Sequence, residues 1–339
     1  MKKNIGIVMV ILLLLIIGAC SDSTMETTKG TESDSNPEPV STDFPKSPIT
    51  VLVPFSPGSL NDTSARILAQ QAEKHLPNEQ PIKIENVEGG GGIIAFTKLM
   101  NAEPDGYTIA YGTSSHVSVL PHLGQAPFTH DSFQPIMKDA ASIPLLMVPT
   151  DAPYDNFDEW VEYVKENPGM FSYATTGPGS ISNLSMMSLA NKLNLDVKNV
   201  VYEGGTQGIT ALLGGNIDGA ISMPISANEH IEAGTLKPIF EFAETSKYED
   251  VKVLSDVNLE EDDIVQAFSM LFAPKGIQKA ELDILHEAFS KAQLSDEYKE
   301  HIKNMEARLL HLNPEESQEN VTVTYNLVGD LLKELGIID

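Results

Sequence analysis

The chain has 339 residues, with 22 basic against 48 acidic side chains and a formal net charge of −26. This balance excludes a nucleic-acid-binding function, because contacts to phosphates need clustered lysines and arginines. The chain contains only two arginines, Arg66 and Arg308, which also excludes a clamp of several arginines around an anion. Its single cysteine, Cys20, excludes an internal disulfide framework.

The first 19 residues are predicted to be an export signal. Lys2 and Lys3 precede an apolar run from Ile5 to Ile17, and small residues follow directly before Cys20. The run is shorter than the about 20 residues of a membrane-spanning helix, which is typical of a cleaved signal. The pattern resembles a bacterial lipoprotein signal, so we expect cleavage of residues 1–19 and acylation of the Cys20 thiol. The alternative is an ordinary signal with an incidental cysteine.

Residues 20–46 are rich in Ser, Thr, Asp, Glu and Pro and nearly free of large apolar side chains. Such a segment cannot bury enough apolar surface to offset its ordering entropy, so we expect a disordered tether between a lipid anchor and the folded body. The remaining residues, about 290, suffice for two lobes of ordinary domain size.

The body alternates short β-branched runs with amphipathic stretches, a pattern typical of α/β layers with parallel strands. In the first half we expect strands at 49–55, 81–87 and 106–113, with helices at 61–76 and 93–102. Two extended pieces at 134–150 then cross to a second lobe. There we expect helices at 156–169, 181–195, 206–216 and 225–234, with strands at 170–175, 197–202, 218–224 and 236–243. An extended run at 265–274 and helices at 279–294, 296–305 and 314–337 return to the first lobe.

This order predicts a hinged clamshell of two α/β lobes, the first formed by residues 47–142 and 265–339 and the second by 143–264. In open parallel sheets, ligands bind outside the carboxyl ends of the strands. The turns that follow the strands are therefore the candidate site.

Signatures of enzymes and metal sites are missing from the sequence. Ser180 lies in GPGSIS, which is not the G-x-S-x-G order of a nucleophile elbow, and Ile94 occupies the third glycine position of a dinucleotide fingerprint. His116, His122 and His130 are irregularly spaced and have no cysteine partners, unlike zinc ligands. We expect neither catalysis nor a cofactor nor a bound metal.

Three turns instead share one kind of chemistry: SPGSLND (56–62), ATTGPGS (174–180) and YEGGTQG (202–208) place glycines and hydroxyl or amide side chains between a strand and a helix. Glycine lets a backbone approach a ligand, and a helix N-terminus offers unpaired N–H groups, so such turns can hold a carboxylate without arginine. In the alternative reading, the polar residues are only helix caps.

Two other groups near these turns have alternative roles. Asp62 and Arg66 are four residues apart on one helix face, where they form a bracing pair or where Asp62 contacts a ligand hydroxyl or ammonium. Thr113, Ser114 and His116 end the third strand and could face the cleft, although His116 could equally be a satisfied surface histidine.

The order of these motifs resembles the substrate-binding proteins of tripartite tricarboxylate transporters, often called the Bug family. VLVPFSPGSLNDTSARILA matches the family's opening loop and helix, IENVEGGGG its glycine turn, and EPDGYTIAYGT its Pro-Asp-Gly-Tyr strand. YATTGPGSISNL and VVYEGGTQGITALLGGNIDGAIS match the turns of the second lobe, and LFAPKGIQKAEL and the closing helix also fit. The likeness covers about residues 48–337.

The resemblance implies a two-lobed clamshell of the periplasmic-binding-protein type II fold with a hinge between lobes. It also implies an extracytoplasmic, monomeric binding protein that captures a small carboxylate and passes it to permease subunits. Ser59, Thr175, Val201 and Glu203 depart from the family pattern in the binding turns, and the acidic Glu203 argues against a highly charged ligand such as citrate. A sensor feeding a histidine kinase and a secreted hydrolase using Ser114 or Ser180 remain alternatives.

The expected ligand-binding residues lie in the three turns and at the end of the third strand: Phe55, Gly58, Ser59, Asn61, Asp62, Thr113, Ser114, His116, Thr175, Thr176, Gly177, Ser180, Asn183, Tyr202, Gly204 and Gly205.

Overall fold

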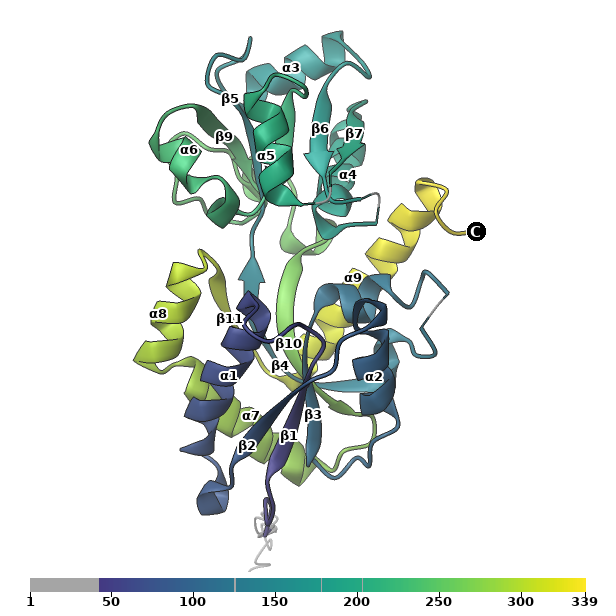
Figure 1. Cartoon of the computed structure of the whole chain (residues 1–339). Coiled ribbons are helices and arrows are strands. Elements are labelled where there is room, and N and C mark those ends of the chain that lie inside the picture. The colour runs from purple at the N-terminus through teal and green to yellow at the C-terminus, as the bar shows by residue number, and fades with distance from the viewer. Residues whose placement is uncertain (1–42, 125, 178, 203) are drawn as a thin grey trace, which may run out of the picture. The chain divides into compact units, whose positions relative to one another are not determined.

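The computed structural model describes residues 43–124, 126–177, 179–202 and 204–339 (Figure 1). The predicted signal peptide, Cys20, most of the tether and Glu203 lie outside these residues. Among the described residues, no helix combines the length and the apolar character needed to cross a membrane.

The first lobe is built on a six-stranded sheet in the order β11-β4-β10-β3-β1-β2. Its strands are β1 (Ile49–Val53), β2 (Ile82–Asn86), β3 (Thr108–Thr113), β4 (Phe133–Ser142), β10 (Ala267–Pro274) and β11 (Arg308–Leu312). β1 pairs with β2 and β3 in parallel, whereas β10 runs antiparallel to both β3 and β4, and β11 runs antiparallel to β4. Nearly every residue of β10 is buried, as expected of a central strand covered on both faces.

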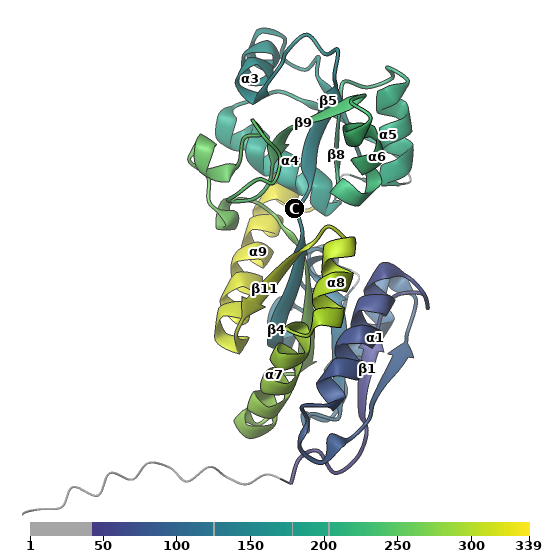
Figure 2. The same cartoon turned by 90° about the vertical axis from the view of Figure 1, so that its left-hand side faces the viewer.

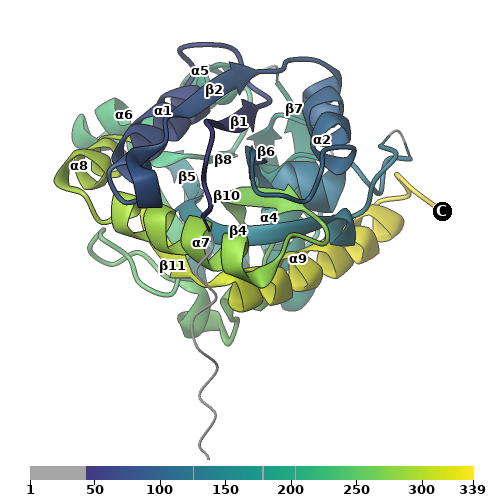
Figure 3. The ribbon, with the colours of Figure 1, turned by 90° about the horizontal axis from the view of Figure 1, so that it is seen from below.

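Helices cover both faces of this sheet. They are α1 (Leu60–Glu73), α2 (Ile93–Met100), α7 (Lys279–Gln293), α8 (Asp296–Asn304) and α9 (Pro314–Glu334). Figure 2 shows α1, α7 and α8 side by side, and Figure 3 shows α2 and α9 on the other side of the strands. One apolar core lies under α1, α7 and α8, and the other lies under α2 and α9, around Phe96 and Phe272.

The second lobe is built on a five-stranded sheet in the order β7-β6-β8-β5-β9. Its strands are β5 (Leu145–Pro149), β6 (Ser172–Thr175), β7 (Lys198–Val201), β8 (Gly219–Ser222) and β9 (Leu236–Glu241). Its helices are α3 (Phe157–Glu166), α4 (Ile181–Leu193), α5 (Gly205–Leu213) and α6 (Asn228–Glu232). β6 pairs in parallel with β7 and β8, and β5 is antiparallel to β8 and β9.

The chain passes between the lobes along two adjacent strands. β4 leads directly into β5, and the return path enters β10, which pairs with β4 up to the partners Ala267 and Ser142. A small apolar cluster adds a further link, because Leu184 of α4 packs with Val328 and Leu332 of α9. The last helix therefore contacts both lobes.

The mixed α/β class with two sheets is the predicted one, but three local expectations were wrong. The sheets are not wholly parallel, since β4, β5, β9, β10 and β11 all run antiparallel to neighbours. β11 was not expected, and residues 115–119 form a π-helical turn after β3. The helix expected at 225–234 is divided into a short 3₁₀ turn and α6. The residue boundaries proposed for the lobes remain a prediction.

Candidate ligand-binding site

A cavity of about 410 Å³ lies where elements of the two lobes meet. The first lobe contributes the start of α1, the end of β3, and parts of β4 and β10, and the second contributes the loop before α4 and the start of that helix. The end of α8 and the residues after it supply the apolar side chains of Ile302, Met305 and Ala307. The cavity thus lies at the carboxyl end of β3.

The wall of this cavity carries no charged side chain among the described residues that line it. It is instead rich in hydroxyl groups, supplied by Ser64, Tyr111, Thr113, Ser114, Ser115, Ser142, Thr176, Ser180, Ser182 and Ser269. Such a wall offers hydrogen bonds and dipoles rather than direct ion pairs.

The N-terminus of α1 forms one edge of the cavity, at Asn61. Ser59 caps this helix: its hydroxyl accepts from the N–H of Asp62 at 3.3 Å, and its carbonyl accepts from that of Thr63. The N–H groups of Leu60 and Asn61 belong to the first turn, where no intrahelical acceptor exists. They are therefore available to an anion.

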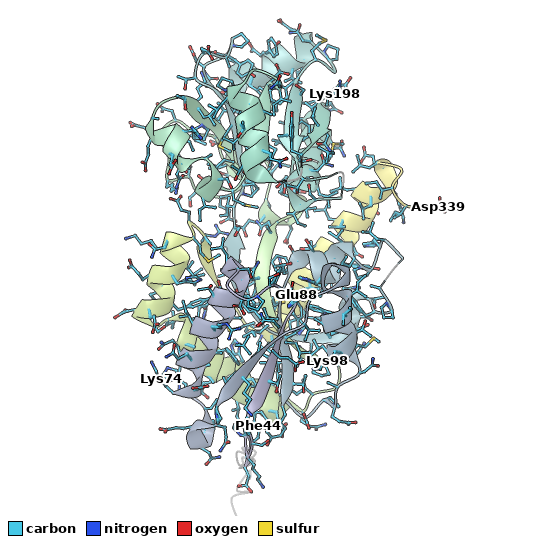
Figure 4. All side chains as sticks on the ribbon, in the orientation of Figure 1. Phe44, Lys74, Glu88, Lys98, Lys198 and Asp339 are labelled. Atoms are coloured by element: carbon cyan, nitrogen blue, oxygen red, sulfur yellow. The ribbon has the colours of Figure 1, made fainter. Side chains whose placement is uncertain are left out.

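The carboxylate of Asp62 stabilises the turn before α1. Its buried carboxylate accepts hydrogen bonds from the N–H of Gly58 at 2.8 Å, from Asn86 Nδ2 at 2.7 Å and from Arg66 Nε at 2.9 Å. Burial raises the pKa of Asp62, but the hydrogen bonds outweigh it, and the net pKa lies below its ordinary value. Ser56 Oγ also donates a hydrogen bond to Glu88 Oε2 at 2.5 Å, which connects the turn to the loop after β2. Glu88 is labelled in Figure 4.

The N-terminus of α4 repeats this arrangement on the second lobe. Ser180 accepts from the N–H of Asn183 at 3.3 Å and donates to the carbonyl of Gly177 at 2.7 Å. The first-turn N–H groups of Ile181 and Ser182 correspond to those of Leu60 and Asn61, and both residues line the cavity. Two serine-capped helix starts therefore supply partial positive charge to one space.

His116 supports the wall from behind. Its ring stacks on Phe96 with centroids 4.8 Å apart and meets the edge of Phe55, which lines the cavity, at 5.5 Å. Its Nδ1 accepts from the N–H of Thr113 at 2.9 Å. Burial lowers the pKa of His116 to about 4, so the ring is neutral at physiological pH. The space for the ring exists because residue 92 is glycine: a Cβ there would lie 2.1 Å from Cδ2 of His116.

A smaller cavity of about 170 Å³ continues the site into the second lobe. Gly204 and Gly205 at the start of α5, with Thr175, form part of its wall, and it shares Thr176, Ser182 and Met223 with the main cavity.

The expected site residues divide into three groups. Phe55, Asn61, Thr113, Ser114, Thr176 and Ser180 line the main cavity, and Thr175, Gly204 and Gly205 line the smaller one together with Thr176. The other seven, which line neither cavity, are Gly58, Ser59, Asp62, His116, Gly177, Asn183 and Tyr202.

None of the last group lines either cavity, and their contact with a ligand stays a prediction. Asp62 and Ser59 shape the turn before α1, and Asn183 Oδ1 accepts from Tyr173 Oη at 2.7 Å inside the second lobe. The N–H of Tyr202 bonds the carbonyl of Thr175. Polar side chains that cap or brace a helix start give the same sequence signal as ligand contacts.

Several wall residues were missed by sequence reasoning. Ser182 lies two residues after the helix cap Ser180, in the motif YATTGPGSISNL. Its place in the first turn of the helix could therefore have been used to predict it as a site residue. Ser142, Ser269 and Tyr111 lie on strands that cross or face the cleft, and nothing in their sequence surroundings separates them from core residues.

A histidine next to Ser114 or Ser180 would favour the hydrolase alternative. In the described structure Ser180 bonds only backbone groups, and Ser114 Oγ accepts from the N–H of Phe268 at 3.4 Å. Ser64 does contact a histidine, at 2.8 Å from His301 Nε2, but its hydroxyl also donates to the carbonyl of Leu60 within α1. Among the described residues, no carboxylate is hydrogen-bonded to His301.

The profile of the family described as tripartite tricarboxylate transporter family receptor, TctC, matches residues 64–337. The chain belongs to this receptor family.

Individual TctC relatives agree with this assignment. A UPF0065 protein of Bordetella pertussis is 29% identical over 297 residues, which are 87% of this chain and 91% of the relative. A TctC solute-binding protein from Polaromonas, 22% identical, superimposes with a TM-score of 0.79 over 86% of this chain and 99% of its own, which shows the shared fold. MatC from Rhodopseudomonas palustris with bound malate is 26% identical, with a TM-score of 0.63 over 85% and 100% of the two chains.

TctC receptors are periplasmic solute-binding proteins of a two-sheet α/β architecture, so this chain acts outside the cytoplasm.

Proposed function

We propose that this TctC receptor captures a small organic carboxylate by hinge closure and delivers it to a tripartite tricarboxylate-type membrane permease, with no chemical change to the ligand. The observation that carries the proposal is the pair of serine-capped helix starts, one on each lobe, at a cavity without charged walls. Helix N-termini bind carboxylates through N–H groups and partial positive charge. The malate bound by MatC, a relative of similar fold, supports this ligand class.

The placement of the two helix N-termini supports closure. Because Asn61 belongs to the first lobe and Ser182 to the second, a carboxylate that bonds both lobes stabilises their approach. The two segments that connect the lobes, between β4 and β5 and directly before β10, are the ones that would bend.

Ligand capture is tested by titrating the purified protein with a panel of mono- and dicarboxylic acids while its thermal midpoint and binding heat are measured. We expect at least one acid to raise the midpoint in proportion to its concentration. The matched uncharged amide of that acid is the control and should not bind. No stabilisation by any acid of the panel would refute the proposal.

We also propose that the protein is held at the outer face of the membrane by a lipid on Cys20, with the residues after it as the tether. The basis is the sequence pattern before Cys20, since this segment lies outside the described structure. The tether ends before Phe44, not at residue 46 as expected, because Phe44 is buried in the core of the first lobe. A Cys20→Ser protein should move from the membrane fraction to the soluble fraction of lysed cells, whereas Ser21→Ala should not. Retention of Cys20→Ser in the membrane fraction would contradict the anchor.

A further inference from the structure

A buried carboxylate lies one hydroxyl group behind the wall of the main cavity. Asp139 on β4 has no exposed surface, and its Oδ2 accepts from Tyr111 Oη at 2.8 Å and from Ser269 Oγ at 3.2 Å. Tyr111 and Ser269 both line the cavity. A carboxyl group that is absent from the cavity surface is thus separated from the cavity by a single side-chain hydroxyl.

The surroundings of Asp139 fit an ionised carboxylate. Beyond Tyr111 and Ser269, Tyr298 Oη of α8 donates to Oδ2, and Gln293 Nε2 of α7 donates to Oδ1 at 3.1 Å. An ionised carboxylate only accepts, and all four neighbours can donate. Burial raises the pKa of Asp139 and these bonds lower it, with burial the larger effect. His311 of β11 reaches it only through Gln293, and no cation among the described residues pairs with it.

The hydroxyl groups of Tyr111 and Ser269 therefore donate their protons to acceptors within the protein. Tyr111 donates to Asp139 Oδ2, and the hydroxyl of Ser269 donates to the same oxygen, with the carbonyl of Ala140 at 3.4 Å and the hydroxyl of Tyr111 as further hydrogen-bond partners. While these bonds persist, a contact that a ligand makes with either oxygen is one in which the ligand donates. A ligand carboxylate at this place would meet lone pairs and a buried charge of its own sign, whereas an ammonium or hydroxyl group would be favoured.

A buried cation lies behind another part of the wall. The ammonium of Lys138 lies 4.4 Å from the ring centre of Phe268, which lines the cavity, and donates to Asn320 Oδ1 at 2.9 Å. The uncharged cavity thus has a negative group behind Ser269 and a positive group behind Phe268. The ammonium of Lys138 itself interacts with the charges of Glu261, Asp262 and Arg308, so the two parts of the wall differ in their electrostatic surroundings.

We propose that Asp139 acts through Ser269 and Tyr111 as a specificity-determining residue, favouring an acid that carries an ammonium or hydroxyl group over the same acid without one. The inference rests on the proposed capture of a carboxylate and adds the ligand's second functional group.

Three acids on one four-carbon skeleton test this proposal: succinate, malate and aspartate, which carry hydrogen, hydroxyl and ammonium at the same carbon. Their dissociation constants are measured by calorimetry with the intact protein and with Asp139→Asn. In the wild type we expect aspartate to bind at least about tenfold more tightly than succinate, as for a hydrogen bond to a charged group, with malate between them. In Asp139→Asn the ratio of aspartate to succinate affinity should fall toward one.

Two further variants distinguish a role of Asp139 in ligand selectivity from a purely structural role. Ser269→Ala should reduce the same ratio without removing the buried carboxylate, so the test survives if Asp139→Asn does not fold. Ser142→Ala, which removes a wall hydroxyl that has no described contact with Asp139, is the matched control and should change all three affinities alike. A purely structural Asp139 would lower the thermal midpoint and leave the ratio unchanged.

The outcomes distinguish this inference from the proposed function. Equal binding of succinate and aspartate by the wild type, or an unchanged ratio in both Asp139→Asn and Ser269→Ala, overturns the role of Asp139 and leaves carboxylate capture intact. If none of the three binds while another acid of the panel does, this inference alone fails. If no acid binds at all, the proposed function fails as well.

Discussion

Asp62 accepts a hydrogen bond from the backbone N–H of Gly58 at 2.8 Å, across the turn that begins α1. Gly58 has a positive φ of 82°, a left-handed conformation that favours glycine, and the carboxylate holds the turn in that shape. The buried Asp62 is thus a brace for the N–H groups that follow it, and the ligand contact that the sequence left open is not needed to explain its place.

Replacing Asp62 with Asn should cost about 1–3 kcal/mol of unfolding free energy at pH 7, because buried donors lose their ionised acceptor. The pKa of Asp62 in the folded protein lies below its ordinary value of 3.8, so its stabilisation is complete above that value and is lost as the pH falls through the folded-state pKa. Urea unfolding at a series of pH values should therefore show the two proteins converging in acid. A gap that persists to low pH would contradict this.

The two serine caps should matter for binding beyond their effect on stability. Ser180→Ala should cost about 1 kcal/mol of stability and weaken carboxylate binding, because the start of α4 loses its fixed geometry. Asn156 provides a control on a helix that lines neither cavity, since its Oδ1 caps α3 by accepting from the N–H of Glu159 at 3.0 Å. Asn156→Ala should lower the thermal midpoint and leave the affinity unchanged. Equal effects of both variants on affinity would argue against the α4 start as a binding element.

Gly92→Ala should be among the most destabilising single substitutions near the site. Its φ is 105°, and the new Cβ would overlap the ring of His116, so we expect a loss of about 3 kcal/mol or more. Gly124 has a positive φ of 69°, but a Cβ added to it would have no heavy atom within 4 Å, so Gly124→Ala should show the backbone cost alone, about 1 kcal/mol. Denaturant midpoints of the two variants compare the effects, and equal losses would mean that the contact with His116 is unimportant.

Lys138→Met should flatten the pH dependence of stability in mildly alkaline solution. Burial lowers the pKa of Lys138 from 10.5 to about 8, so between these values the unfolded chain holds a proton that the folded protein has released. Stability then rises with pH in the wild type, by up to about 3 kcal/mol over the interval. Calorimetric midpoints from pH 7 to 10 should show this rise in the wild type and much less of it in Lys138→Met. The buried tyrosines titrate in both proteins and cancel in the comparison.

Sequence patterns predicted the elements that carry a strong local signal. β1, β3 and α1 follow from β-branched runs and a capped amphipathic helix, and the serine caps of α1 and α4 could be read directly from Gly-Ser before a helix. β11 was missed because Arg308–Leu312 alternates too weakly and is stabilised only by pairing with β4. Tertiary pairing of this kind overrides local propensity.

The cavity itself was only partly predictable. Ser59 and Ser180 have the same sequence context, yet Ser180 lines the cavity and Ser59 lies behind it, because that difference depends on how each turn is oriented. The role of Asp139 could not be predicted from the sequence, since a charged residue in a strand is normally expected at the solvent-exposed surface. Its partners come from residues 111, 269, 293 and 298, which are distant in sequence and meet only in the folded protein.

The pairing of Ser142 with Ala267 gives the fold a modular character. The whole segment between these two residues leaves and rejoins the first sheet at one point, on neighbouring antiparallel strands. A short turn could join the strands at that point and complete a six-stranded domain with its own helices. The second lobe is, in this sense, a large insertion into a β-hairpin, and an exchange of it would leave the first sheet intact but would have to preserve the apolar contact of α9 with Leu184.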